Sequence, residues 1–171
     1  VTGVQTCALP IFTTQPSGAA SGAALTQQPV VEVRDSGGNL VEDYSGSFSV
    51  TQTAGANTLD SVAFTQPVIS GGVATFSDLT LTGLKASDYK LTFSTGGKSL
   101  ESSAITLGFG SIHHLVITTQ PSGAASGAAL TQQPVVEVRD SGGNLVEDYR
   151  SEEHTSELQS LAYLVCRLLL E

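Results

Sequence analysis

The sequence predicts an all-β protein, on three observations. The chain of 171 residues contains 18 glycines, no Trp and no Met, and its abundant Thr, Ser and Val favour strands and turns over helices. Short runs alternate apolar with polar residues, which is the period of a half-buried strand. Glycine-bearing turns separate these runs. Together these features indicate short strands packed around a common core.

A segment of 32 identical residues occurs twice, beginning at Thr13 and again at Thr118, so the period is 105 residues. Solenoid repeats have about 20 to 50 residues, whereas an immunoglobulin-like β-sandwich has about 100. The period is therefore that of a whole domain and predicts tandem sandwich domains. A recent duplication and an assembly error would both produce such identity, and residues 13–110 form a complete unit in either case.

Both ends of the chain depart from the repeat. After Tyr149 the sequence switches to RSEEHTSELQS, and a DNA segment encoding these residues has a reverse complement that encodes VTGVQTCALPI, residues 1–11. That segment resembles a common sequencing adapter, as does the LVCRLLLE tail, which suits a metagenomic fragment. We therefore divide the chain into a non-native flank (1–12), an immunoglobulin-like repeat (13–110), the truncated start of a second copy (111–149) and a non-native tail (150–171).

The flanks contain features that would otherwise suggest a function. Cys7 and Cys166 are the only cysteines and both lie in the flanks, so we give a disulfide no weight. The apolar run 161–170 is interrupted by Arg167 and is shorter than the roughly 20 residues of a membrane span. The spacing over 151–171 predicts an amphipathic helix, which we interpret as spurious. The N-terminus lacks the basic region of a secretory signal.

Within one repeat the pattern predicts about seven antiparallel strands, the number of a simple immunoglobulin-like sandwich. Turns are predicted at Asp35–Asn39 and Gly96–Gly97, and SGAASGAAL is predicted to be a connection between the sheets. In the first copy the flank residues Leu9–Phe12 take the place of the first strand. The predicted strands lie at 113–118 (in the second copy), 29–35, 45–53, 59–64, 73–81, 87–94 and 104–107.

The clearest alternation places Tyr89, Leu91 and Phe93 on one face of a strand. Tyr89 fits the tyrosine corner of immunoglobulin-like sandwiches, in which the hydroxyl bonds to upstream backbone. The second copy holds only its first two or three strands, and a half-sandwich cannot bury two sheets. We expect residues 111–149 to be poorly packed.

Three segments, LVITTQPSGAASGAALTQQPVVEVRDSGGNLV, GGVATFSDLTLTG and DYKLTFSTGG, resemble the recurring pattern of bacterial immunoglobulin-like repeats of large surface and secreted proteins. The resemblance covers residues 12–149. It implies spacer or adhesive modules in tandem arrays and an extracellular or cell-surface location. The implied partners are neighbouring repeats of the same chain, and a host or cell-surface ligand is compatible with it. It assigns no functional residue.

Charge and motifs exclude several classes of function. Residues 12–149 carry five basic and twelve acidic side chains, a net charge of −7, which argues against nucleic acid and anionic membranes as partners. No GxSxG elbow and no phosphate-binding loop in a strand-to-helix context are present. The sequence therefore predicts no enzyme and assigns no catalytic, cofactor or metal residue.

Two sets of metal-ligating residue types are nevertheless present. His113 and His114 are adjacent, and neighbours in a strand point to opposite faces, so we expect no chelation by both. Asp35, Glu42 and Asp43 surround a turn and could approach calcium through carboxylate oxygens, but without EF-hand spacing. The sequence leaves calcium binding at this turn open.

Three functions are compatible with these observations. The leading one is a structural or adhesive module. In the second, the loops SGGN (36–39), AGAN (54–57) and TGLKASD (82–88) recognise a carbohydrate or a protein, although they offer no aromatic platform. The third is an accessory domain of a secreted enzyme.

Overall fold

The computed structural model describes residues 9–147, and every regular element in that range is a strand. The all-β prediction is thus confirmed, while the helix expected over 151–171, Cys7 and Cys166 lie outside the described residues. The strands are β1 (Leu9–Thr14), β2 (Ala19–Ala20), β3 (Val30–Arg34), β4 (Ser49–Ala54), β5 (Leu59–Ala63), β6 (Val68–Ser70), β7 (Val73–Thr75), β8 (Thr80–Gly83), β9 (Ala86–Thr95), β10 (Lys98–Glu101), β11 (Ile105–Gly108), β12 (His114–Thr119) and β13 (Val135–Arg139).

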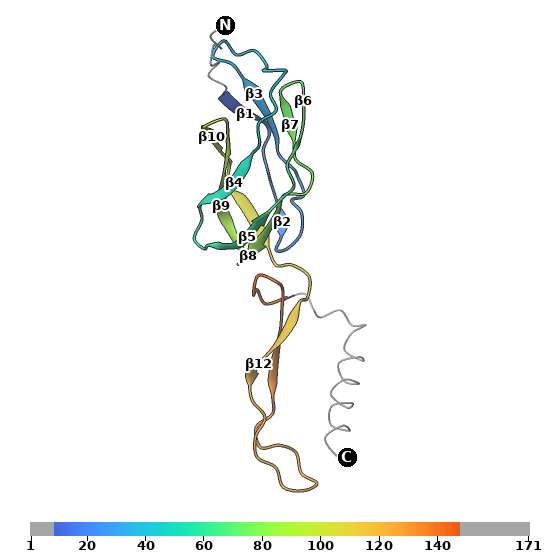
Figure 1. Cartoon of the computed structure of the whole chain (residues 1–171). Coiled ribbons are helices and arrows are strands. Elements are labelled where there is room, and N and C mark those ends of the chain that lie inside the picture. The colour runs from blue at the N-terminus through green and yellow to red at the C-terminus, as the bar shows by residue number, and fades with distance from the viewer. Residues whose placement is uncertain (1–8, 148–171) are drawn as a thin grey trace.

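Strands β1 to β11 form one packed unit, residues 9–110, which we call the body (Figure 1). One sheet has the order β1-β3-β7-β6, and the other has the order β10-β9-β11-β2 with β4 also paired to β9. A separate pair, β5-β8, completes the body. All pairings are antiparallel except that of β11 with β2. The sheets face each other across a single core, as in a β-sandwich.

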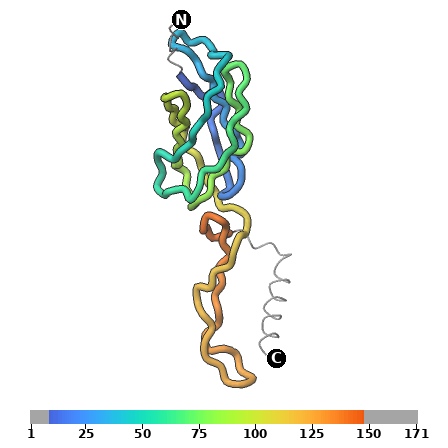
Figure 2. Tube along the Cα trace, viewed as in Figure 1, coloured from blue at the N-terminus to red at the C-terminus, as the bar shows by residue number. Residues whose placement is uncertain are grey.

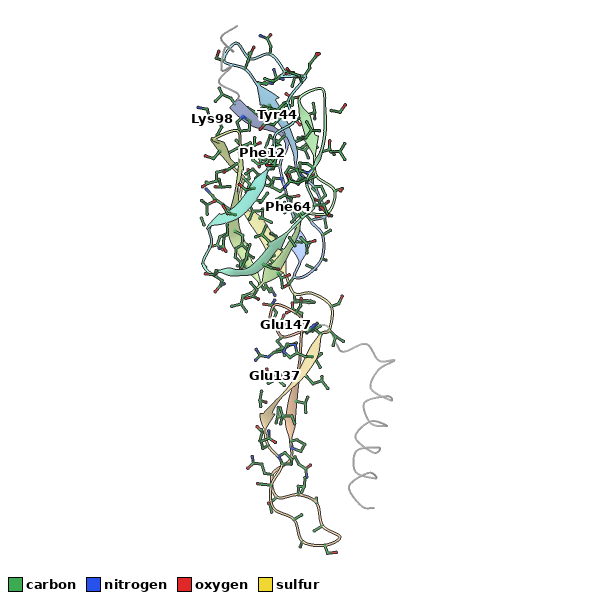
Figure 3. All side chains as sticks on the ribbon, in the orientation of Figure 1. Phe12, Tyr44, Phe64, Lys98, Glu137 and Glu147 are labelled. Atoms are coloured by element: carbon green, nitrogen blue, oxygen red, sulfur yellow. The ribbon has the colours of Figure 1, made fainter. Side chains whose placement is uncertain are left out.

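The core follows from the alternation of the strands. Val31 and Val33 on β3 and Tyr89, Leu91 and Phe93 on β9 are fully buried, as the sequence predicts. Aromatic rings link the two sheets edge to face, an arrangement that their quadrupoles favour. The Phe76 ring lies 5.6 Å from that of Phe48 and 5.4 Å from that of Phe93, and Figure 3 shows Phe12 and Phe64 within the same body.

The run 73–81, predicted as one strand, is divided between two sheets. β7 pairs with β3, whereas β8 pairs with β5. The buried positions are Ala74 and Phe76 before the crossing and Leu79 and Leu81 after it, so the alternation shifts by one residue at 77–78, where the chain changes sheet. At the crossing the Gln28 side chain takes the place of a strand partner: its amide accepts the Leu79 N–H at 3.0 Å and donates to the Leu79 carbonyl at 3.1 Å.

Three short strands, β2, β6 and β10, are missing from the sequence prediction. β6 pairs with β7 through the turn Gly71–Gly72, where both glycines have positive φ. β2 lies within SGAASGAAL, expected to be only a connection, and pairs with β11 over two residues. β2 and β6 are shorter than the runs that an alternation pattern can identify, and β10 has only four residues. The predicted hairpin turn at Gly96–Gly97 is confirmed between β9 and β10.

Tyr89 makes the predicted bond to upstream backbone. Its hydroxyl donates to the Leu84 carbonyl at 2.7 Å, and the side chain is fully buried. Burial raises the pKa of this hydroxyl above its usual value, so the proton that makes the bond is retained at all physiological pH values.

The second copy consists of a two-stranded hairpin, β12 with β13, which extends from one end of the body (Figure 2). Among the described strands, none outside the pair joins this sheet. Leu115 is 64% exposed and Val136 is 48% exposed. The expectation that this copy is poorly packed is confirmed.

Candidate functional site

The turn Asp35–Asn39, at the end of β3, is built from its own hydrogen bonds. Asp35 Oδ1 accepts the N–H groups of Gly37 and Asn39, both at 2.9 Å. Arg34 donates to the Gly38 carbonyl at 2.6 Å and is ion-paired with Glu32. The N–H groups, that of Asn39 first, lower the pKa of the Asp35 carboxyl. Residues 36–40 are exposed, so the turn is ordered by local contacts alone.

The second copy repeats this turn at Asp140–Asn144, in a different environment. Asp140 Oδ1 accepts the N–H groups of Gly142 at 2.9 Å and Asn144 at 2.8 Å. Asp140, however, is fully buried and Asn144 is only 8% exposed. The turn lies against the end of the body from which the hairpin extends (Figure 1). We call this contact the junction.

Three hydrogen bonds cross the junction, each from a side chain of the second copy to backbone of the body. Asp140 Oδ2 accepts the Gly110 N–H at 2.6 Å. Asn144 accepts the Lys85 N–H at 2.6 Å through Oδ1 and donates to the Gly83 carbonyl at 2.9 Å through Nδ2. Both polar side chains are therefore satisfied on burial, as buried polar groups require.

The charge of Asp140 is retained in the junction. Burial acts to raise the pKa of this carboxyl, but the N–H groups of Gly110, Asn144 and Gly142 outweigh it, and the pKa lies below its usual value. Hydrogen bonds to an ionised acceptor are stronger than those between neutral groups. The Lys85–Glu147 ion pair, at 3.7 Å with both side chains largely exposed, adds little.

Small residues make this close approach possible. A Cβ at Gly142 would overlap the Gly83 carbonyl oxygen and Ser21 Oγ, and a Cβ at Gly110 would overlap the Ser21 carbonyl oxygen. Gly142 does not have a positive φ. Its lack of a side chain is therefore required by the contact across the junction and not by its own backbone conformation.

The structure brings together two of the three loops singled out from the sequence, but from different copies. TGLKASD of the body contains Gly83 and Lys85, which meet the SGGN turn of the second copy. AGAN lies beside TGLKASD, since Ala56 N–H donates to Asp88 at 2.8 Å. The SGGN turn of the first copy follows β3 at the opposite end of the body (Figure 1).

Sequence reasoning did not identify Ser21 or Gly110 as contact residues. Ser21 lies in a small-residue stretch and Gly110 is the last residue of the body, and small residues of this kind are typical of flexible connections. DSGGN recurs after each VVEVR segment, and this recurrence could have identified the turn as a contact. It gives no information about the surface against which the turn packs.

Neither metal candidate is assembled into a site. The Nδ1 atoms of His113 and His114 lie 3.3 Å apart. The expectation that the two rings point apart is therefore wrong, because His113 lies just before β12. Within residues 9–147 no group of three or more His, Cys, Asp or Glu side chains could hold a metal ion. Asp35 is bonded within its own turn, while Glu42 and Asp43 are exposed.

A shallow hollow of about 550 Å³ follows β4, β5 and the loop between them and is lined by residues 50–62. It includes the AGAN loop, and Asp60 is its charged member. A neutral polar ligand is the chemistry that such a lining can take, through backbone groups and the hydroxyls of the loop.

No helix in the part of the chain from residue 9 to 147 is long and apolar enough to cross a membrane. Comparison with protein-family models, with curated proteins and with solved structures finds no match to this chain.

Proposed function

We propose that residues 13–110 are a structural or adhesive immunoglobulin-like module of a bacterial cell-surface or secreted protein, used in tandem with further copies. The observation that carries the proposal is the junction. Polar side chains of one copy satisfy backbone groups of the preceding copy, so the two copies meet through a specific contact. A spacer needs such contacts, because a flexible linker would not hold a fixed separation.

Features of the body support the immunoglobulin-like assignment. Two facing sheets share one core, and the buried Tyr89 bonds to the Leu84 carbonyl, as in a tyrosine corner. The acidic surface suits a solvated extracellular domain. In this proposal residues 1–11 and 150–171 are adapter-derived and take no part in the function.

Sequencing the source locus with long reads across both ends tests the tandem part of the proposal. We expect SGSFSV after Tyr149, as it follows Tyr44, and a strand similar to HHLVIT in front of Thr13. Genomic reads that instead continue into RSEEHTSELQS would overturn the interpretation of the flanks. A catalytic domain beside a single repeat would favour an accessory domain of a secreted enzyme.

The hollow beside AGAN favours the alternative function, a carbohydrate- or protein-binding accessory domain. Glycan and protein arrays probed with the full chain distinguish the two functions, and a spacer is expected to bind nothing. The matched variants are Asn57→Ala, in the lining of the hollow, and Asn39→Ala, in the distant turn. Binding that Asn57→Ala removes and Asn39→Ala retains would replace the spacer with a binding module.

A further inference from the structure

The SGGN turn of the first copy has the same geometry as the turn in the junction but contacts no other copy. The two turns have the same Asp-to-backbone bonds. Each is also braced by an arginine, since Arg34 donates to the Gly38 carbonyl and Arg139 to the Gly143 carbonyl. The turn thus adopts its docked shape before it docks, which lowers the entropy lost on association.

The acceptor and donor atoms used in the junction are available on the first turn. Asp140 Oδ2 bonds to the Gly110 N–H, whereas among the described residues Asp35 Oδ2 contacts only the Asn39 amide at 3.3 Å. Asn144 bonds to Gly83 and Lys85, whereas within the described part of the chain the Asn39 side chain bonds only to Asp35. Three hydrogen-bonding positions that are satisfied in one copy therefore have no partner outside their own turn among residues 9–147 in the other.

Gly37 provides a second, independent observation. A Cβ at Gly37 would meet only atoms of its own turn, Asn39 Nδ2 at 3.2 Å and Asp35 Oδ1 at 3.3 Å. Its φ is not positive. Nothing in the first copy strictly requires glycine at this position, but the equivalent Gly142 is required by the surface on which it docks.

From these observations we propose that the Asp35–Asn39 turn is a docking surface for the C-terminal end of a preceding copy of this repeat. It receives from that copy the backbone groups equivalent to Gly83, Lys85 and Gly110. The inference deepens the proposed function and rests on its tandem part. Because the two surfaces lie at opposite ends of the body (Figure 2), the contact is head to tail and does not close on itself. Each added copy presents the same turn to the next.

The existing junction is tested first, in the full chain, with a matched pair of variants. Gly142→Ala is expected to accelerate hydrogen exchange of the Gly110 and Lys85 N–H groups by about tenfold or more, because undocking exposes both. Gly37→Ala places the same methyl group on the same turn outside the junction, and it is expected to leave both rates unchanged. Equal rates in the two variants would show that the junction contact is not formed in solution and would overturn the inference.

The docking surface itself is tested in a lengthened chain, in which residues 1–117 are followed by residues 13–171. This insertion places the turn of the middle copy against the end of a complete preceding copy. Gly37→Ala in the middle copy is now expected to accelerate exchange at Gly110 and Lys85 of the preceding copy by about tenfold. Asn39→Ala removes the side-chain amide that would bond to the preceding copy and introduces no steric overlap. It is also expected to accelerate exchange at these two N–H groups.

The outcomes separate the inference from the proposed function. Unchanged exchange in both middle-copy variants would overturn the docking surface, whatever the locus contains. Accelerated exchange, combined with a locus that encodes a single repeat, would support the surface and contradict its use in an array.

Discussion

Residues 13–44 and 118–149 are identical, yet the same side chains have different environments in the two copies. Val31 is fully buried in the body, whereas its counterpart Val136 is 48% exposed in the hairpin. Complete burial of a valine contributes about 1.5 to 3 kcal/mol relative to exposure. The comparison shows that the sequence of this segment does not decide whether its apolar face contributes to stability. The strands added after Tyr44 decide it.

The pairing within the two hairpins, by contrast, is the same. β1 pairs with β3 and β12 with β13 in equivalent registers, each with an irregularity at the same position. Thr26 donates to the Gly18 carbonyl at 2.9 Å, and Thr131 donates to the Gly123 carbonyl at 3.0 Å. Hydrogen bonds among near neighbours form whether or not a core is present, because both partners belong to the same hairpin.

The outer strands of the two hairpins differ in sequence. Leu9–Phe12 in the body replaces His114–Ile117 of the second copy, with the same partners on the neighbouring strand. Phe12 packs its ring 5.1 Å from that of Phe93. The continuous apolar run Leu9–Phe12 is sufficient for this position, and its Pro10, which lacks a backbone N–H, is tolerated because β1 is an edge strand.

The largest effect is expected from introducing a charge at the matched valines. Val31→Asp places an unpaired carboxylate in the core and should destabilise the body by about 4 kcal/mol or more, comparable to the whole stability of a small domain. Val136→Asp, on a half-exposed position, should change the stability of the body by less than about 0.5 kcal/mol. Thermal and urea denaturation of both variants measure the difference. Similar losses would contradict the difference in burial between the copies.

A smaller effect is expected at Tyr89, in the part of the sandwich that the second copy lacks. Tyr89→Phe removes the hydroxyl and leaves the Leu84 carbonyl without its partner, which should destabilise the body by about 1 to 2 kcal/mol. Urea denaturation measures this loss, and amide protection of β12 and β13 serves as the internal control. A parallel loss of protection in the hairpin would show that the two regions unfold as one unit.

The smallest effect is expected from acid at the two aspartates. The pKa values of Asp35 and Asp140 are both lowered in the folded chain, so ionisation stabilises each turn. This contribution is complete above the unfolded value of about 3.9 and is lost as pH falls through the lower folded values. The Gly110 amide resonance should therefore move only below about pH 4. A transition near neutral pH would contradict the role assigned to Asp140.

The sequence predicts the turn of the candidate site but not the surface against which the turn packs. The DSGGN turn and its Asp-to-backbone bonds follow from residue types that stabilise turns locally. The surface that receives the turn combines Ser21, Gly83 and Gly110, which are far apart in the chain and carry no motif. Close backbone contact of this kind is decided by the folded shape, and glycine in a sequence indicates equally a turn, a linker or a contact.

By itself, the sequence determined the all-β class, the repeat period, the main strands with their buried faces and the turns. Each of these depends on residues close together in the chain, or on an alternation that one face of a sheet imposes. Only the tertiary structure decided which sheet each half of the run 73–81 joins, the short strands β2, β6 and β10, and the junction. These depend on contacts between distant segments, whose backbone groups are the same in every sequence and therefore leave no pattern in it.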